Sequence, residues 1–491
     1  MYAYLTFEGG KPSLMPEGGG RVAEFENASS LFQYLIEKIP QPIIFADGLT
    51  GAGKNSQKLA SIFDKFSEIK EKRELTAGER HTVRALDGTI YRAELCAEYA
   101  PGRAKRIVFV NFDEMALPVD TLIERFGLDD QPRVRLAAMQ RYRALLRQEG
   151  LTSFTARKNA EKELLPLYEA HFPKLPEHVD NLVSAAYRGG IMRAPTEKAT
   201  FENVDAYDFR GLYSSIYADK LPTGQGAYKA GDCTGAEWRA LIDFNRCFSV
   251  VRFFSNITSG EDGFLPDMRM ARADGSRELL TLTGGDIFMA RLLGYEFNNI
   301  SVVESVSFNL SPSPLSEYAK KWEKKKANAA TWAQRSIAKK MLNVPAGAFG
   351  SKTPLRYIPA AAYITSIGRL KWLSAAELSR LEGSEVIYGN TDSLHLRGSA
   401  HALANAAEKL REVGYLGAGA AGKLSLEHSF PEATYRGINL YAGKCADGGE
   451  VVKAAGLPLK SKKQLNYDNF KNGCEIVAEY GDGSKIIWRF D

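Results

Sequence analysis

Two acidic residues that lie far apart in the sequence, Asp208 and Asp392, have the chemistry needed for phosphoryl transfer. Asp392 sits in a polar turn, residues 389–393, between apolar runs at 386–387 and 394–396, which predicts a β-hairpin with the carboxylate at its tip. Asp208 lies on a predicted strand. Enzymes that transfer phosphoryl groups between nucleotides hold two metal ions about 3.5–4 Å apart between carboxylates. A lone aspartate at a strand end is more often a turn or capping residue, so the two are informative only as a pair.

A basic segment offers the cations that such a site needs. Between Glu317 and Lys340 only Glu317 and Glu323 oppose the basic residues Lys320, Lys321, Lys324, Lys325, Lys326, Arg335, Lys339 and Lys340. A solvated helix face is the plain interpretation of such a run. However, Arg335 and Lys339 are four residues apart and share one face of a helix, from which they could bind a triphosphate. Lys326 could join them.

The elements that position these residues change in character along the chain. The first ~180 residues alternate strand-like stretches (42–46 and 106–112) with helix-like stretches (29–39 and 58–66), which predicts an α/β domain. Residues 136–172 have a helical pattern. A helix is expected to begin at 212–217, a helical hairpin at 315–342, and a break at 343–347 should end that hairpin before Pro345.

Composition limits the class of protein. With 491 residues, 44% hydrophobic and 25% charged, the chain predicts a globular protein of two or three domains. No apolar run is long enough for a membrane span, and the N-terminus lacks a secretory pattern, so we expect a cytoplasmic protein without membrane partners. Five scattered Cys residues argue against a zinc or disulfide framework. The net charge of +5 permits a polyanionic partner.

Four motifs together resemble the protein-primed family B DNA polymerases of bacteriophages and linear plasmids. Residues 208–214, Asp-Phe-Arg-Gly-Leu-Tyr-Ser, resemble motif A (DxxSLYP), and 338–343 resemble the Kx3N start of motif B. Residues 388–393, Tyr-Gly-Asn-Thr-Asp-Ser, are one change from the YGDTDS of motif C, and 187–190 match YxGG. The motifs occur in the family order. The resemblance is specific from 187 to about 473 and thinner before it.

The resemblance implies a fold, partners and a cofactor. We expect a degenerate, ribonuclease-H-like 3′–5′ exonuclease domain at 1–180, followed by a right-hand polymerase. Palm and fingers would occupy 187–430, with a terminal-protein-type insertion in 222–312 and fingers at 315–350, and the thumb 431–491. Template, primer, deoxynucleoside triphosphates and a terminal protein are the implied partners, in a bacterial or phage-infected cell. Two Mg²⁺ ions, replaceable by Mn²⁺, are the implied cofactor.

The resemblance also assigns roles to residues of this chain. Asp208 and Asp392 would be catalytic metal ligands, with the Phe209 carbonyl as a third ligand. Tyr213 would exclude a 2′-hydroxyl. Arg335, Lys339 and Asn343 would bind the nucleotide. The implied DNA or primer contacts are Tyr187, Gly189, Gly190, Thr365, Arg369, Thr391, Tyr441 and Lys453.

Several positions depart from the family pattern. Asn390 replaces the first Asp of motif C and loses its charge, and Asn439 replaces the Lys of a KxY motif that retains Tyr441. Residues 343–347 lack the usual Asn-Ser-x-Tyr-Gly. Only 38 residues separate 350 from 388, too few for the second insertion of phage members. In the N-terminal part Glu8 alone survives of the exonuclease carboxylates, which predicts loss of proofreading.

Two alternatives remain open. Residues 48–55 are one residue from a P-loop (GxxxxGK[ST]), but Asn55 replaces the hydroxyl residue that binds Mg²⁺, which makes NTPase activity the minor alternative. The replaced motif residues also allow a non-catalytic DNA-binding or replication scaffold that has kept the fold. Asp208, Tyr213, Lys339 and Asp392 argue against such a scaffold, because decay should not spare all four.

Overall fold

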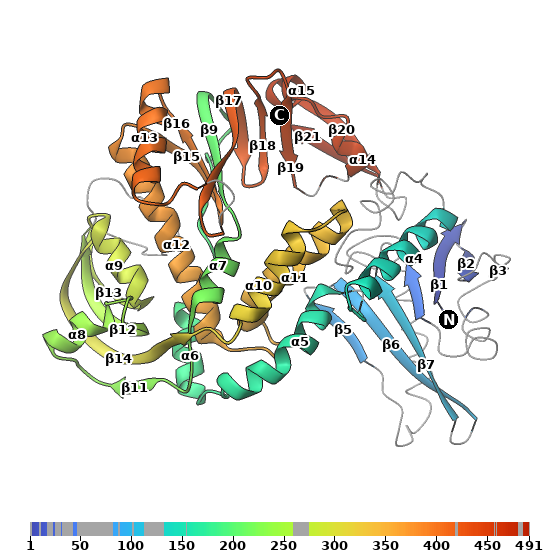
Figure 1. The fold of residues 1–491 in the computed structure, drawn as a ribbon, viewed down its shortest axis with the longest axis horizontal. Coiled ribbons are helices and arrows are strands. Elements are labelled where there is room, and N and C mark those ends of the chain that lie inside the picture. The colour runs from blue at the N-terminus through green and yellow to red at the C-terminus, as the bar shows by residue number, and fades with distance from the viewer. Residues whose placement is uncertain are drawn as a thin grey trace.

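The computed structural model describes most of the chain after residue 131 and parts of the chain before it. The described residues are 2–8, 11–16, 23–24, 31, 43–46, 82–86, 89–100, 103–111, 132–153, 155–258, 274–417, 421–455, 457, 459–479 and 485–490. Separate sheets joined by helices make up this part of the chain (Figure 1). The predicted multidomain α/β and α+β class is therefore confirmed, while the exact domain boundaries remain predictions.

The N-terminal sheet is mixed. Its strands are β1 (Tyr2–Glu8), β2 (Lys11–Pro16), β3 (Ala23–Glu24), β4 (Ile43–Ala46), β5 (Thr82–Leu86), β6 (Thr89–Ala100) and β7 (Arg103–Asn111). They lie in the order β3-β2-β1-β4-β7-β6-β5, with β4 parallel to both β1 and β7. The predicted strands at 42–46 and 106–112 correspond to β4 and β7. The helices expected at 29–39 and 58–66 fall almost entirely outside the described residues.

Three helices lead from this sheet toward the centre of the molecule. The stretch 136–172, predicted to be helical, forms α4 (Pro132–Gln148) and α5 (Ala156–His171), and α6 (Glu177–Ala186) follows. The Thr155 side chain accepts a hydrogen bond from the Lys158 amide and caps α5. Glu177 and Asp180 in the first turn of α6 complement its helix dipole.

A central antiparallel sheet carries the predicted site. Its strands are β8 (Met192–Arg193), β9 (Ala199–Phe209), β15 (Glu385–Asn390), β16 (Ser393–Arg397), β17 (Leu424–Gly437), β18 (Leu440–Lys444) and β19 (Glu450–Ala454). The order is β19-β18-β17-β9-β16-β15-β8, so β9 lies in the middle. The predicted hairpin is β15–β16, and the predicted helix at 212–217 is α7 (Leu212–Asp219). The site therefore lies on paired strands, which hold side chains more rigidly than loops do.

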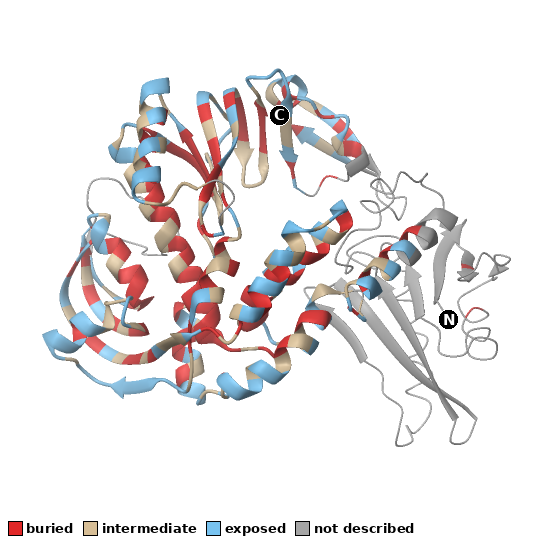
Figure 2. Ribbon diagram, viewed as in Figure 1, coloured by how far each residue is buried: buried red, intermediate tan, exposed pale blue. Residues whose placement is uncertain are grey.

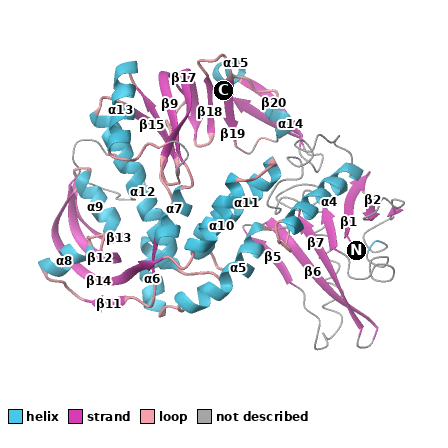
Figure 3. Cartoon of the chain, in the orientation of Figure 1, coloured by secondary structure: helices cyan, strands magenta, loops and turns pink. Residues whose placement is uncertain are grey.

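The segment predicted as an insertion forms a sheet of its own. It contains β10 (Lys220–Pro222), β11 (Ala227–Ala230), α8 (Gly235–Leu241), β12 (Cys247–Thr258), β13 (Asp274–Thr283), α9 (Gly284–Leu292) and β14 (Glu296–Pro312). The long strand β14 pairs with β10, β11 and β12. Figure 3 shows this sheet and its two helices lying away from the central sheet.

The basic segment forms an antiparallel helical hairpin, α10 (Ser316–Ala327) and α11 (Trp332–Gly350). The prediction that this helix ends at Asn343, before Pro345, is wrong, because α11 continues for another turn and more. Pro345 has no amide hydrogen for the Met341 carbonyl, which would normally accept it. The Tyr318 hydroxyl donates to that carbonyl instead (2.7 Å). The helix survives its proline because a side chain from α10 supplies the missing hydrogen bond.

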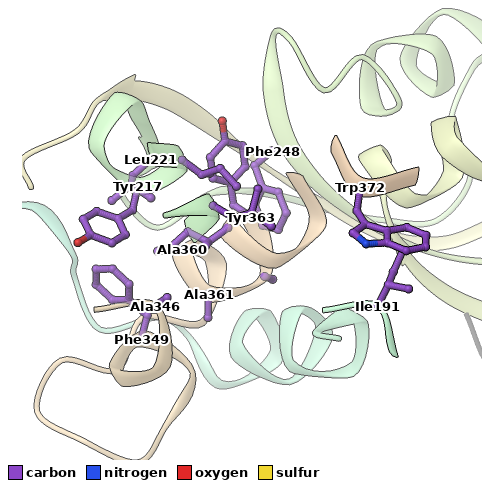
Figure 4. Packing of buried hydrophobic residues seen from close by; sticks show 14 of the residues in the cluster. Ile191, Tyr217, Leu221, Phe248, Ala346, Phe349, Ala360, Ala361, Tyr363 and Trp372 are labelled. Atoms are coloured by element: carbon purple, nitrogen blue, oxygen red, sulfur yellow. The ribbon is translucent and has the colours of Figure 1, made fainter. Parts of the chain in front are cut away.

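Helix α12 (Ile358–Leu381) connects the helical hairpin directly to β15 and is buried along much of its length (Figure 2). It fills most of the interval between 350 and 388. The small residues Ala360 and Ala361 at its start allow aromatic side chains, among them Phe248, Phe349 and Tyr363, to gather around it (Figure 4). Helix α13 (Ala400–Glu412) packs beside α12.

The C-terminal part has a small core of its own. It comprises α14 (Leu459–Lys462), α15 (Tyr467–Asn472), β20 (Cys474–Glu479) and β21 (Lys485–Phe490), around Tyr467 and Phe470. None of the helices within the described ranges combines the length and apolarity needed to cross a bilayer.

Replacing Tyr318 by Phe should cost roughly 1–3 kcal/mol of stability, because the buried Met341 carbonyl loses its donor. In a Pro345→Ala background the amide of residue 345 can donate, so the same Tyr318→Phe change should cost much less. Urea unfolding of wild type, Tyr318→Phe, Pro345→Ala and the double variant measures the free energy of unfolding from which both costs follow. Equal costs in the two backgrounds would contradict this account of α11.

Candidate active site

The register of the central sheet brings Asp208 and Asp392 together. Asp208 pairs with Ser393 of β16 on one side and Ser425 of β17 on the other. The Phe209 amide donates to the Asp392 carbonyl (2.8 Å), and the Ser393 hydroxyl donates to Oδ1 of Asp208 (3.2 Å). Two residues selected from separate motifs thus lie at the same end of neighbouring strands.

The tip of the β15–β16 hairpin is locked in place by close packing. Thr391 adopts a left-handed conformation (φ 60°) that disfavours β-branched residues, and its amide donates to the Ile191 carbonyl (2.7 Å). A Cβ atom on Gly389 would lie 2.2 Å from Cζ2 of Trp372, so only glycine fits there. The Trp372 indole donates to the Ser393 carbonyl (2.8 Å). These contacts fix the turn that presents Asp392.

Burial makes the ionised form of the two carboxylates unfavourable, which favours the binding of a proton or of a cation. Burial, with the nearby charges of Asp392 and Glu427, raises the pKa of Asp208 to about 7, and Lys339 partly offsets the rise. Burial also raises the pKa of Asp392, against the positive charges of Lys339 and Lys453. Two adjacent desolvated carboxylates repel each other when both are ionised, and a bound cation removes that repulsion.

The donor set suits a hard divalent cation. Carboxylate oxygens at the ends of β9 and β16 are the ligands that Mg²⁺ prefers, with water and phosphate oxygens to complete its octahedron. In the described part of the chain, no group of three or more His, Cys, Asp or Glu side chains is arranged to hold a metal ion. The residues present therefore fit a cation shared by two carboxylates and its substrate, and the Phe209 carbonyl stays a predicted ligand.

The residues predicted to bind the nucleotide share one face of α11. Arg335, Lys339 and Asn343 follow one another at intervals of four, and all three are exposed. Thr331 and Gln334 form a capping box that fixes the start of this helix. The charge of Lys339 is close enough to lower the pKa of both Asp208 and Asp392. The structure thus brings Lys339 to the carboxylate pair.

The lysines of α10 are used differently. Four of them have a carboxylate partner: Lys320 with Glu317 (2.8 Å), Lys321 with Glu163 (2.6 Å), Lys325 with Glu149 (2.7 Å) and Lys326 with Glu323 (3.1 Å). Glu163 lies on α5, and Glu149 follows α4. The basic segment is therefore divided, because α10 is tied to the N-terminal helices while α11 faces the carboxylates. Lys326 is paired within its own helix, and its joining Arg335 and Lys339 stays a prediction.

Tyr213 lies in a slot made by glycines. A Cβ atom on Gly190 would lie 2.8 Å from the Tyr213 hydroxyl, and one on Gly368 would lie 2.9 Å from Cε1 of the ring. Gly211, just before α7, has φ 57°, which explains a glycine where motif A has serine. Burial raises the pKa of Tyr213 to about 12. The ring is thus held as a rigid neutral wall near Asp392, whose charge also acts on that hydroxyl.

The YxGG turn packs directly on the site. Gly190 also lets the chain approach Thr391, whose Cα would be 3.0 Å from a Cβ atom at position 190. Tyr187 at the start of the turn lies against Gly350 at the end of α11, because a Cβ there would be 2.8 Å from its hydroxyl. The turn therefore touches both the hairpin tip and the helix that carries Lys339.

Arg369 and Thr365, predicted to contact primer or priming protein, are each only 5% exposed. Arg369 forms a buried ion pair with Asp286 of α9 (2.7 Å) and donates to the carbonyls of Arg188 and Gly189 (2.9 and 2.7 Å). The Thr365 hydroxyl donates to backbone carbonyls one turn earlier in α12. Arg369 thus joins the insertion to the YxGG turn, and a direct contact of either residue with primer stays a prediction.

Tyr441 and Lys453 lie opposite each other on β18 and β19. The Tyr441 ring packs against Tyr388 and Tyr435, with ring centroids 5.3 and 5.6 Å apart, and His395 completes this aromatic cluster. Lys453 Nζ lies 5.7 Å from the centre of the Tyr441 ring. Both side chains therefore lie on neighbouring strands at one side of the central sheet, and their contacts with primer stay a prediction.

Sequence reasoning missed two carboxylates. Glu427 follows Leu426 at a β-bulge of β17, which disturbs the alternation that would have indicated its direction. Asp286 lies in the first turn of α9, where acidic residues are common, and Thr283 caps that helix. In the sequence, the only indication that Asp286 is buried is its place as a charged residue within an otherwise apolar run.

Two predictions concern the N-terminal part. The P-loop-like segment 48–55 lies outside the described residues. Glu8 is the last residue of β1 and pairs in register with Lys11, and its side chain is likewise outside the description.

Comparison with known proteins agrees with this geometry. Residues 57–358 match the family model described as DNA polymerase type B, organellar and viral. The chain is 25% identical over 390 residues to the DNA polymerase of Bacillus phage phi29, and 23% identical over 394 residues to that of Streptococcus phage Cp-1. These alignments cover 66% and 68% of this chain and 64% and 65% of those relatives.

The fold comparison extends further. A phi29 DNA polymerase complexed with primer-template DNA superposes with a TM-score of 0.77 at 17% identity, over 100% of both chains. The ternary complex of the same polymerase with incoming nucleotide substrates gives 0.73 at 18% identity, over 98% and 96% of the two chains. At this identity the likeness concerns the fold.

Asp208→Asn should stabilise the protein in the absence of divalent cations. Because the folded state raises the pKa of Asp208 from 3.8 to about 7, its contribution to stability is fully present at low pH and is lost as the pH rises through 7. Asn avoids that loss, so the gain in Tm in EDTA should be larger near pH ~8 than near pH ~4.5. Asp447→Asn, at an exposed turn, is the control, and a gain independent of pH would contradict the account.

Proposed function

The chain belongs to the type B DNA polymerases of organelles and viruses, and from this premise we propose that it is a template-directed DNA polymerase. It would join deoxynucleotides to a 3′ hydroxyl, or to a hydroxyl of a priming protein. The observation that carries the proposal is the strand register that places Asp208 opposite Ser393 and next to the Asp392 turn, with both carboxylates desolvated and within reach of the charge of Lys339.

The carboxylates would hold the metal ions that the reaction needs. Two Mg²⁺ ions, with Mn²⁺ as a substitute, would activate the attacking hydroxyl and stabilise charge on the reacting phosphate. Asp208 and Asp392 supply the charged ligands, and the Phe209 carbonyl is the proposed third. Because the chain partly excludes water from both carboxylates, their attraction for a cation is stronger than it would be at an exposed surface.

The exposed face of α11 would bind the triphosphate. Arg335 offers a planar guanidinium suited to two phosphate oxygens, and Lys339 a compact charge already close to the carboxylates. Asn343 follows on the same face and would contact the nucleotide. A helix fixed at its start by a capping box and in its middle by Tyr318 can hold these groups ready without ordering a loop.

DNA and the priming protein would approach from the thumb side and the insertion. Tyr441 and Lys453 would contact the primer strand, while Thr391 and the Tyr187–Gly190 turn would contact DNA beside the site. Arg369 and Thr365 would act from within, by positioning that turn. The sheet at 220–312 would receive a terminal protein. The site of action would be the cytoplasm of a bacterial or phage-infected cell.

We further propose that the protein lacks proofreading. Of the carboxylates that an exonuclease site needs, the sequence retains Glu8 alone. A two-metal nuclease requires several such ligands. The N-terminal domain would then hold template strand.

A non-catalytic DNA-binding scaffold is the second candidate, favoured by the neutral residues at Asn390 and Asn439. A scaffold has no use for two desolvated carboxylates beside a lysine, which are costly to bury without a cation. Extension of a labelled primer by wild type and by Asp392→Asn separates the two candidates.

Asp392→Asn should reduce primer extension in Mg²⁺ by at least about a thousandfold, since it removes half of the charged ligand set. Single-turnover extension of a labelled primer-template measures it. Asp447→Asn is the matched control and should extend like wild type. Equal extension by Asp392→Asn would exclude the proposed site, and primer-template binding by a wild-type protein that never extends would support the scaffold.

Tyr213→Val should raise the incorporation of ribonucleotides relative to deoxyribonucleotides by at least about tenfold, because a smaller side chain leaves space for the 2′-hydroxyl. Tyr213→Phe keeps the ring and should keep the discrimination. The ratio of kcat/KM for the two nucleotides measures it. If Phe and Val behave alike, the ring is not the barrier.

A further inference from the structure

Two of the residues that depart from the family motifs are in contact with each other. Nδ2 of Asn390, at the end of β15, donates to Oδ1 of Asn439, in the turn between β17 and β18 (2.9 Å). These are the positions where motif C and the KxY motif were expected to carry Asp and Lys. An acid and a base have thus both been replaced by amides, and the summed charge of the two positions is the same.

The backbone around Asn439 shows that its place is closely determined. Its φ of 58° lies in the left-handed region, where Asn is tolerated far better than a long side chain. Its amide donates to the Tyr388 hydroxyl (3.2 Å), and its carbonyl accepts from the Ala455 amide (3.0 Å). The side chain of Asn439 is therefore presented to Asn390 from a firmly held turn at the base of the thumb.

Asn390 also contacts the turn that presents Asp392. Its carbonyl accepts from the Asp392 amide (2.7 Å), and its side-chain oxygen lies 3.4 Å from the Thr391 hydroxyl. The amide–amide contact thus joins the turn that presents Asp392 to the turn that begins β18, the strand of Tyr441.

We propose that Asn390 and Asn439 form a charge-neutral positioning pair that replaces an acid–base pair and fixes the Asp392 turn relative to the thumb. This inference rests on the proposed polymerase function. Each departure from the motifs would be harmful alone, and together they compensate. The pair suits a site where Glu427 already adds negative charge near Asp208 and Asp392, because an aspartate at 390 without a cation at 439 would add another unpaired carboxylate.

A double-mutant cycle tests whether the two residues act as one unit. Asn390→Ala removes the donor, and Asn439→Gly removes the acceptor while leaving a residue that accepts the left-handed backbone. Each single change should lower single-turnover kcat by roughly tenfold with primer-template Kd nearly unchanged, and the double variant should be no worse than the poorer single one. Effects on kcat that multiply in the double variant would overturn the proposal.

A matched pair elsewhere controls for the loss of an amide contact. Asn299 of β14, also left-handed (φ 53°), donates to Asn256 of the neighbouring strand β12 (3.2 Å) in a contact exposed to solvent. In extension of a DNA primer without any priming protein, Asn299→Gly and Asn256→Ala should leave kcat within about twofold of wild type. A tenfold loss in these controls as well would overturn the specific role assigned to the Asn390–Asn439 contact.

Restoring the charges tests compensation directly. Asn390→Asp and Asn439→Lys should each extend primers poorly, and the double variant Asn390→Asp/Asn439→Lys should extend better than either. Titration with Mn²⁺ alone, without DNA or nucleotide, should show tighter binding for Asn390→Asp than for wild type and a return toward wild type in the double variant. If the loss of extension rate in the double variant equals the product of the losses in the two single variants, the two substitutions do not compensate each other and the proposal is refuted.

The double-mutant cycle can also be measured without polymerase activity. If the wild type extends no primer, the proposed function fails, whereas Tm in EDTA and Mn²⁺ affinity of the same variants still decide whether the pair is coupled. Additive changes in both quantities would then overturn the pair itself.

Discussion

The antiparallel pairing of β9 with β16 is the constraint on which the rest of the site depends. It places Asp208 opposite Ser393 and joins Phe209 to Asp392 by a backbone hydrogen bond. Two carboxylates are thereby held together where water is partly excluded, and burial raises the pKa of both. Such a pair is unfavourable unless positive charge is brought to it. The surrounding elements are arranged so that a cation can be bound there and lysines lie within electrostatic reach.

The helical hairpin shows how this positive charge is kept available. Lysines of α10 are paired with carboxylates of the N-terminal helices, which attach the hairpin to that part of the chain. On α11 the residues Arg335, Lys339 and Asn343 stay exposed on one face. The same sequence segment thus contains an anchoring helix and a presenting helix. The distinction depends on which carboxylates the fold brings near each lysine.

Small residues and one buried ion pair connect the site to the remaining sheets. Glycines at 190, 368 and 389 allow the YxGG turn, Tyr213 and Trp372 to pack within distances that any Cβ atom would block. The Arg369–Asp286 pair ties the insertion to the same turn. The sheet at 220–312 and the YxGG turn beside the hairpin tip are thus joined by buried, hydrogen-bonded contacts of Arg369.

Local patterns in the sequence were enough to predict the hairpin around Asp392, the strand of Asp208, the helical basic segment and the α/β character of the N-terminal part, because each depends on neighbouring residues alone. The helix end at Asn343 was predicted wrongly, since the hydroxyl that compensates for Pro345 comes from Tyr318 on another helix. The burial of Arg369, the approach of Glu427 and the contact of Asn390 with Asn439 likewise depend on residues distant in sequence. Spacing along the chain shows which side chains have suitable chemistry, and only the packing of distant segments decides which of them meet.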